Sequence, residues 1–95
     1  MNSLRGKTAI VTGANSGMGF ATVKALADAG AHVIMLCRDE RRGKDALLKL
    51  KEDPHRSLDL ILCDLGDYSS ICAFTEEVKR KYRHIDILVW SVHLL

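Results

Sequence analysis

Short apolar runs alternate with stretches of helical periodicity along the 95-residue chain. The apolar runs predict four strands, at Thr8 to Val11, His32 to Cys37, Leu58 to Cys63 and Ile85 to Val89. The second and third of these runs are expected to be buried strands. Apolar residues at three- and four-residue steps predict three helices, from about Gly17 to Ala29, from a cap at Asp39 to Asp53-Pro54, and from a cap at Asp67 to Tyr82. Gly30 follows the first helix as a stop signal. This alternation is the layout of parallel βαβ units.

The order of these elements predicts the topology of the sheet. Crossovers between parallel strands are right-handed, which places the first two helices on one face and the third helix on the other. The fold class is therefore α/β, a partial doubly wound Rossmann fold with a parallel sheet of about four strands in the order 3-2-1-4 and three helices. The fourth strand is expected to be an uncovered edge of the sheet.

Length and charge restrict the classes of protein that the chain can represent. Ninety-five residues, 47% of them hydrophobic, are enough for one domain with a modest core. A net charge of +2 is too small to indicate nucleic-acid binding. No apolar run approaches the ~20 residues of a membrane span, and no signal peptide precedes the first strand, so we expect a cytoplasmic protein without membrane contact.

The cysteines and histidines do not form a metal or disulfide pattern. The three cysteines are odd in number and include no Cys-x-x-Cys pair. The four histidines are scattered without the spacing of metal ligands. We therefore predict reduced thiols and no metal site.

A glycine-rich turn stands between the first strand and the first helix. It reads Thr12-Gly13-Ala14-Asn15-Ser16-Gly17-Met18-Gly19, with the spacing T-G-x-x-x-G-x-G. Gly13 permits the tight turn, Gly17 lets the backbone approach a diphosphate, and Gly19 lets the helix pack close to the strand. The helix amino terminus offers free N–H groups to phosphates, Ser16 adds a hydroxyl donor, and Asn15 tolerates a left-handed backbone. No Lys-Ser or Lys-Thr follows the glycines, which excludes a P-loop.

This turn resembles the cofactor signature of the short-chain dehydrogenases/reductases. The wider string from Gly6 to Gly17 looks like the retinol-dehydrogenase-like branch, and the resemblance covers residues 5 to 89. We accordingly interpret residues 1–89 as the N-terminal half of a dinucleotide-binding Rossmann domain and residues 90–95 as a divergent C-terminal tail. The cofactor-binding residues that we assign to this turn are Gly13, Asn15, Ser16, Gly17, Met18 and Gly19.

The end of the second strand bears on which nucleotide is bound. An acidic side chain there accepts from a ribose 2′-hydroxyl, whereas an arginine pairs with a 2′-phosphate. This chain has Cys37 followed by Arg38, and Cys37-Arg38-Asp39 resembles the NADP-preferring members of the family. Arg38 offers a planar fork suited to phosphate, so the sequence favours NADP over NAD, although Asp39 keeps NAD open as the alternative.

A second pair of residues follows the third strand. In the family, the aspartate at this position accepts from the adenine amino group and the following backbone contacts the ring. The resemblance therefore assigns these roles to Asp64 and Leu65. The alternative is that Asp64 only caps the turn that leads to Asp67.

The catalytic residues of the family have no counterpart in this chain. The family motif after the fourth strand continues Asn-Asn-Ala-Gly, but this sequence continues from Trp90 to Leu95 without it. The catalytic Tyr-x-x-x-Lys pair is also missing, because Tyr68 is followed four residues later by Cys72 and Tyr82 by Asp86. Ser91 and His93 lack the third group that would make them a nucleophile and base. The resemblance thus implies a chain that stops before the catalytic half, and no catalytic residue is assigned.

Two classes of function follow from these observations. The first is the NADP(H)-binding portion of a short-chain dehydrogenase/reductase, whose complete relatives interconvert small alcohols and carbonyls by hydride transfer. The second is a noncatalytic nucleotide-binding or assembly module that self-associates through the exposed strand edge. A nonfunctional remnant is a third alternative. Whether the chain alone is an enzyme, and on which substrate the family chemistry would act, stay open.

Overall fold

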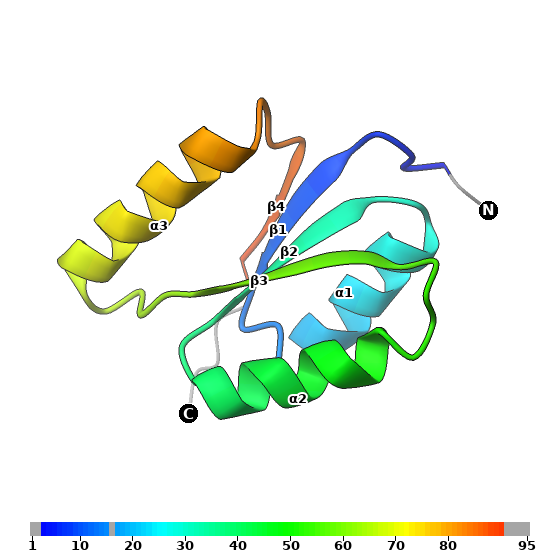
Figure 1. Cartoon of the computed structure of the whole chain (residues 1–95), viewed down its shortest axis with the longest axis horizontal. Coiled ribbons are helices and arrows are strands. Elements are labelled where there is room, and N and C mark those ends of the chain that lie inside the picture. The colour runs from blue at the N-terminus through cyan, green and yellow to red at the C-terminus, as the bar shows by residue number, and fades with distance from the viewer. Residues whose placement is uncertain (1–2, 16, 91–95) are drawn as a thin grey trace.

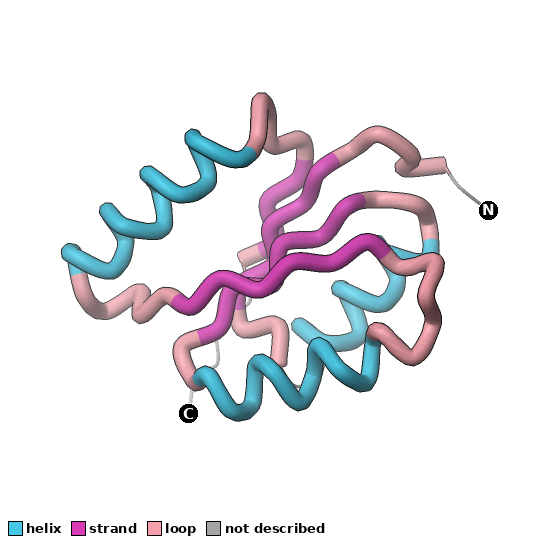
Figure 2. The backbone as a smooth tube through the Cα atoms, in the orientation of Figure 1, coloured by secondary structure: helices cyan, strands magenta, loops and turns pink. Residues whose placement is uncertain are grey.

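Four parallel strands form one sheet with helices on both of its faces (Figure 1). The computed structural model describes residues 3–15 and 17–90. The elements in chain order are β1 (Thr8–Thr12), α1 (Gly17–Asp28), β2 (His32–Cys37), α2 (Glu40–Leu50), β3 (Ser57–Leu62), α3 (Tyr68–Lys81) and β4 (Ile87–Val89). Strands and helices alternate strictly along the chain, as Figure 2 shows.

The strand order confirms the predicted topology. The sheet runs β3-β2-β1-β4, and each neighbouring pair is parallel. Ile10 of β1 lies opposite Ile34 of β2 on one side and Leu88 of β4 on the other. All four strands therefore end at the same edge of the sheet.

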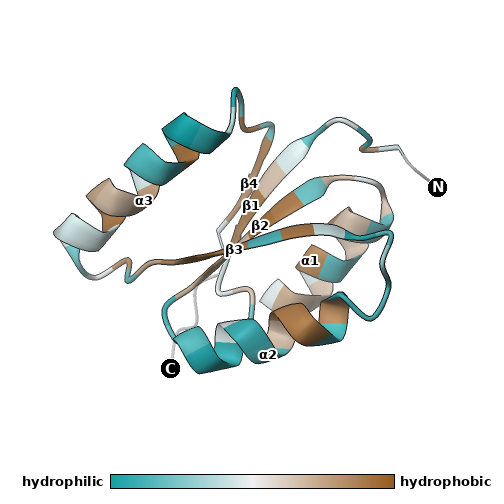
Figure 3. Cartoon of the chain, in the orientation of Figure 1, coloured by the Kyte–Doolittle hydropathy of each residue, from teal (hydrophilic) through white to brown (hydrophobic). Residues whose placement is uncertain are grey.

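The helices divide between the two faces as predicted. Helices α1 and α2 lie together on one face, and α3 lies alone on the other (Figure 1). Val11, Val33 and Met35 point to the α1/α2 side, where they form a core with Val23 and Leu50. The opposite core is smaller, and its members are Ile10, Ile34, Leu36, Ile61 and Cys63, with Ile71, Phe74, Val78, Tyr82 and Ile85 packed against them. Strong apolar colouring in Figure 3 follows the strands and the C-terminal half of α2.

Local capping chemistry fixes where the helices begin and end. Gly30 has a φ of 102°, and its N–H donates to the Ala27 carbonyl while the Ala31 N–H donates to the Leu26 carbonyl. These two bonds form a Schellman motif, with Gly30 in the left-handed position that the sequence predicts. Asp39 and Asp67 are the N-caps of α2 and α3, also as predicted.

Three expectations about the strands need correction. The third strand starts at Ser57 and ends at Leu62, one residue earlier than predicted, and only Ile61 within it is buried. The predicted full burial is wrong because β3 is an edge strand with a single neighbour. The fourth strand starts at Ile87 rather than Ile85, since Ile85 packs against the α3 side before pairing with β1 begins.

The expected edge at β4 is present in the described part of the chain. Leu88 of β4 is 63% exposed. The strand is held at its start, where the Asp86 N–H donates to the Thr8 carbonyl and the Thr8 N–H donates to Asp86 Oδ2, both at 2.9 Å. The hydrogen bond from Thr8 lowers the pKa of Asp86, which keeps this carboxylate charged. Among the described residues, no helix is long and apolar enough to cross a membrane.

A polar network joins the end of α3 to the edge of the sheet where the strands begin. The Tyr82 hydroxyl donates to Asp59 Oδ2 at 2.5 Å and lies 3.2 Å from Nε2 of His32. Nδ1 of the same histidine lies 2.5 Å from Ser57 Oγ. Burial and the hydrogen bond to Asp59 both raise the pKa of Tyr82, so its hydroxyl stays protonated and donates. The network therefore joins β2, β3 and α3.

Replacing Tyr82 by phenylalanine is expected to lower the free energy of unfolding by about 1–3 kcal/mol, because Asp59 and His32 lose a shared partner in a half-buried position. Chemical denaturation measures this change. Tyr68→Phe is the matched control, since Tyr68 is 80% exposed. Equal stabilities of the two variants would contradict a stabilising role for the network.

Candidate functional site

Three turns meet at the edge of the sheet where the strands end. They follow β1, β2 and β3, and each leads into the next helix. Because the strands are parallel and in register, these turns lie next to one another in the order of the sheet. The carboxyl edge of such a sheet is where doubly wound proteins bind ligands. Every predicted cofactor residue that the structure describes lies in one of these turns or in the first turn of α1.

The turn after β1 has a backbone that depends on its glycines. Gly13 and Gly17 each have a φ of 60°, in the left-handed region where a side chain is strained. No residue other than glycine in the described part of the chain has a positive φ. The turn is therefore shaped by two of the positions that its glycine spacing predicts.

Gly19 is required for a different reason. A Cβ at this position would overlap the Gly13 carbonyl oxygen and lie 2.8 Å from the Gly13 carbonyl carbon and 3.2 Å from the Ala14 Cα. Gly19 is buried in the first turn of α1, so the helix rests directly on the backbone of the turn. The start of α1 is thereby held against the end of β1.

The remaining predicted residues of this turn differ in exposure. Asn15 is half-buried, and Met18 is 81% exposed at the start of α1. Ser16 lies outside the described residues. The exposed Met18 therefore stands at the surface of the candidate site rather than in the core.

Two consecutive residues at the end of β2 differ in burial. Cys37 is 2% exposed, and burial raises the pKa of its thiol, although the Ala14 backbone N–H acts in the opposite direction. Arg38 is exposed at the start of the turn. The strand thus ends with an inward thiol and a guanidinium at the surface.

Asp39 is already engaged by the protein. Its Oδ1 accepts from the Arg42 N–H at 3.1 Å, which makes it the N-cap of α2. An N-cap carboxylate is stabilised by the helix dipole, and that side chain is committed to the helix. The Asp39 carboxylate, which from the sequence could have bound the ribose of NAD, therefore has a structural role as a helix cap.

The turn after β3 holds Asp64 and Leu65. Oδ1 of Asp64 accepts from the Gly66 N–H at 2.9 Å, so this side chain does cap the turn. Oδ2 of the same carboxylate has no partner among the described residues. The structural and the ligand-binding interpretations of Asp64 are thus compatible, because each uses a different oxygen.

Two residues near these turns were missed by the sequence analysis. Ser70 accepts from the Asp64 N–H through its Oγ at 2.8 Å. Gly43 of α2 has no room for a larger side chain without adjustment, because its Cβ would lie 3.2 Å from Leu60 Cδ1 and 3.3 Å from Cys37 Cβ. A glycine inside a helical pattern is a signal of close packing that the sequence does contain. Ser70 gives no such signal.

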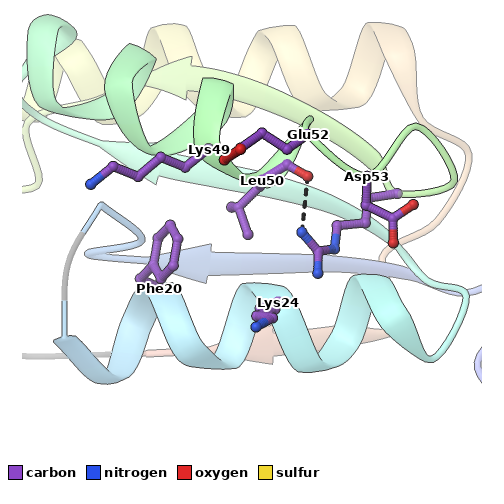
Figure 4. A pocket seen from close by; sticks show the side chains of 7 residues that line it. Phe20, Lys24, Lys49, Leu50, Glu52 and Asp53 are labelled. Atoms are coloured by element: carbon purple, nitrogen blue, oxygen red, sulfur yellow. Dashed lines mark hydrogen bonds between the residues drawn. The ribbon is translucent and has the colours of Figure 1, made fainter.

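A groove on the α1/α2 face lies apart from the predicted cofactor residues (Figure 4). Its volume is about 530 Å³, and its lining residues are Phe20, Lys24, Lys49, Leu50, Glu52, Asp53 and Arg56. Nε of Arg56 donates to Asp28 Oδ1 at 2.7 Å, and Nη1 donates to the Leu50 carbonyl at 3.0 Å. The arginine thus ties the end of α2 to α1 as part of the scaffold.

In the described part of the chain, no three histidine, cysteine, aspartate or glutamate side chains are grouped so that they could hold a metal ion. Cys37 is the last residue of β2 and Cys63 directly follows β3, but their side chains enter the cores on opposite faces of the sheet.

Comparison with known proteins identifies the family. The sequence profile of the short chain dehydrogenases matches residues 7–93. The chain belongs to the short-chain dehydrogenase family. The predicted membership is confirmed, and the matched segment contains all three turns of the candidate site.

Relatives of this chain agree with the family assignment. The WW domain-containing oxidoreductase of Gallus gallus is 42% identical over 87 residues, which are 90% of this chain and 21% of that protein. Dehydrogenase/reductase SDR family member 13 of Homo sapiens is 38% identical over 90 residues, 94% of this chain and 24% of that protein, in agreement with the predicted branch. The chain therefore spans about a fifth to a quarter of the length of these two relatives.

A solved structure gives the same fold. L-sorbose reductase from Gluconobacter frateurii, complexed with NADPH and L-sorbose, superposes with a TM-score of 0.87 at 29% identity. The superposition covers 99% of this chain and 36% of the reductase.

Proposed function

We propose that the chain binds NADP(H) across the three turns at the carboxyl edge of the sheet, as the nucleotide-binding portion of an alcohol/carbonyl oxidoreductase. The observation that carries the proposal is the backbone of the β1–α1 turn. Two glycines there have positive φ, and a third has no space for a Cβ against the turn. A bare backbone at a helix amino terminus is suited to a diphosphate.

The other two turns supply recognition of the nucleotide. The exposed Arg38 is suited to the 2′-phosphate, because a guanidinium binds phosphate oxygens through two parallel hydrogen bonds. Capping of α2 by Asp39 supports NADP over NAD, since this carboxylate is engaged by the Arg42 N–H. Oδ2 of Asp64 is available to accept from the adenine amino group, and the backbone of Leu65 lies beside it.

The family relationship supports an oxidoreductase rather than an assembly module. The complex of sorbose reductase with NADPH supports the choice of nucleotide. NADPH, when bound, supplies a hydride for transfer to a carbonyl. The residues of this chain would bind and orient the nucleotide, whereas the two tyrosines of the chain form no Tyr-x-x-x-Lys pair for the proton transfer.

Four finer features of the protein belong to the same proposal. Residues 1–89 are assigned to the nucleotide-binding half-domain and residues 90–95 to a tail that falls largely outside the described residues. A cytoplasmic location, self-association through β4, and a small alcohol or carbonyl substrate in a full-length form are likewise proposed.

Titration of the chain with NADPH and NADH tests the proposal. NADPH is expected to bind at least about 10-fold more tightly than NADH, because one charge-assisted hydrogen-bonded pair with the 2′-phosphate contributes about 1.5–3 kcal/mol. No carbonyl reduction by the chain alone is expected. Fluorescence of the bound nicotinamide measures affinity, and absorbance at the nicotinamide band measures turnover. Equal affinities would contradict the NADP preference, and the absence of binding to either nucleotide would contradict the function.

A further inference from the structure

We infer that Ser70 is a positioning residue for recognition of the adenine base, an inference that rests on the proposed function. Ser70 lies in the first turn of α3, six residues beyond Asp64. Its Oγ accepts from the Asp64 N–H at 2.8 Å, which places a helix side chain on the backbone of the preceding turn. This hydrogen bond links the start of α3 to Asp64, the residue proposed to bind the adenine amino group.

The hydroxyl is needed because β3 is an edge strand with β2 as its single neighbour, so only every second amide along it faces another strand. The last ladder contact of the strand exit is the Cys63 N–H donating to the Cys37 carbonyl at 2.9 Å. The next amide, that of Asp64, has no strand beside it, and a half-buried N–H without an acceptor is unfavourable. Ser70 supplies the acceptor that the sheet does not provide on this side of β3.

Asp64 is thereby fixed on three sides. Ser70 holds its N–H, the Asp67 N–H donates to its carbonyl at 3.0 Å, and the Gly66 N–H donates to its Oδ1 at 2.9 Å. Only Oδ2 lacks a partner among the described residues. The orientation of this oxygen, and hence its reach to an exocyclic amino group, therefore depends on the backbone that Ser70 holds.

Loss of the hydroxyl should act on one feature of the nucleotide. Without Ser70 Oγ, the Asp64 N–H has to find a water molecule as its acceptor. The backbone is expected to rotate toward solvent to reach it, and the carboxylate moves with the backbone. Ser70 lies in α3, outside the β1–α1 turn that is proposed to hold the diphosphate. A dinucleotide that lacks the adenine amino group should therefore be much less sensitive to the change.

The experiment compares NADPH with its deaminated analogue, in which hypoxanthine replaces adenine. In Ser70→Ala the affinity for NADPH is expected to fall about fivefold, with less than a twofold change for the analogue. The preference of the protein for NADPH over the analogue therefore falls by about the same factor. Ser70→Thr, which keeps a γ-hydroxyl, is expected to restore the preference.

Ser69→Ala is the matched control. Ser69 is the exposed neighbour, and it takes part in capping only through its backbone N–H, which donates to Asp67 Oδ1. Its affinities for both ligands should equal those of the wild type. Thermal unfolding by circular dichroism shows whether each variant is folded at the titration temperature.

Hydrogen exchange on the wild type provides a test that needs no variant. The Asp64 amide should be protected relative to the Leu65 amide, which has no acceptor among the described residues. Equal, unprotected exchange of the two amides would overturn the inference.

The outcomes separate this inference from the proposed function. Equal weakening of both ligands in Ser70→Ala, or an unchanged preference, overturns the positioning role while nucleotide binding by the wild type stands. If the wild type binds neither ligand, the proposed function fails and the role of Ser70 fails with it.

Discussion

Gly19→Ala is expected to reduce the affinity for NADPH by on the order of 100-fold, the largest effect of a single methyl group at this site. The added Cβ would overlap the Gly13 carbonyl, and backbone atoms cannot move aside as a flexible side chain can. Helix propensity alone would favour alanine by about 1 kcal/mol. The overlap is expected to outweigh this gain, so the turn must open and its amide groups lose their alignment. Calorimetric titration with NADPH measures the loss.

Gly43→Ala is the control for this substitution. It also replaces a buried helix glycine by alanine, but the nearest atoms to its Cβ belong to the side chains of Leu60 and Cys37. The Leu60 methyl groups end a flexible side chain and can shift by a few tenths of an ångström, and the remaining contact, with the Cys37 Cβ at 3.3 Å, is far less close than the overlap at Gly19, so binding should stay within about twofold of the wild type. Comparable losses in both variants would indicate a general packing defect and contradict a specific role for the turn.

Arg38→Ala is expected to reduce the affinity for NADPH by about 10- to 100-fold and to leave the affinity for NADH nearly unchanged, because only NADPH carries the 2′-phosphate. Parallel titrations with both nucleotides measure the change in selectivity. The effect on NADPH should also weaken as the salt concentration rises, since an exposed ion pair is screened.

Arg80→Ala provides the matched control for charge. Arg80 is an exposed cation in the last turn of α3 and lies at the end of that helix away from the three turns. Its removal lowers the net charge equally but should not alter either affinity. If Arg38→Ala weakens NADPH and NADH by the same factor, Arg38 contributes a general electrostatic field and not recognition of the 2′-phosphate.

Much of the fold was accessible from the sequence because its signals are local. The position of Gly30 after α1 and the caps at Asp39 and Asp67 depend on hydrogen bonds within a few residues. The strand order followed from the handedness of crossovers. The partial burial of β3 could not be predicted, because the sequence of an apolar run is the same in kind whether the strand is central or at the edge of the sheet.

The candidate site was accessible only in part for a related reason. Glycine spacing predicts the shape of a turn, and the positive φ of Gly13 and Gly17 agrees with it. The contact between Ser70 and Asp64 spans the boundary between a strand exit and a helix, and a serine at the start of a helix is ordinary in sequence. The use of Asp39 as a cap was predicted, but its consequence for the choice of nucleotide needed the observed bond to Arg42.

The Cys37 thiol at the end of β2 is buried, so a change of nucleotide preference from NADPH to NADH would require changes in the packing of the interior. The alternative nucleotide is usually recognised by a carboxylate at this strand end, and here that position is filled by Cys37, which lies against the one α2 residue without a side chain. An aspartate there would enter a space shaped for a small sulfur atom and would have to find donors in it. Redesign toward NADH would therefore have to start beneath the surface, at positions 37 and 43 together, before the guanidinium at 38 is altered.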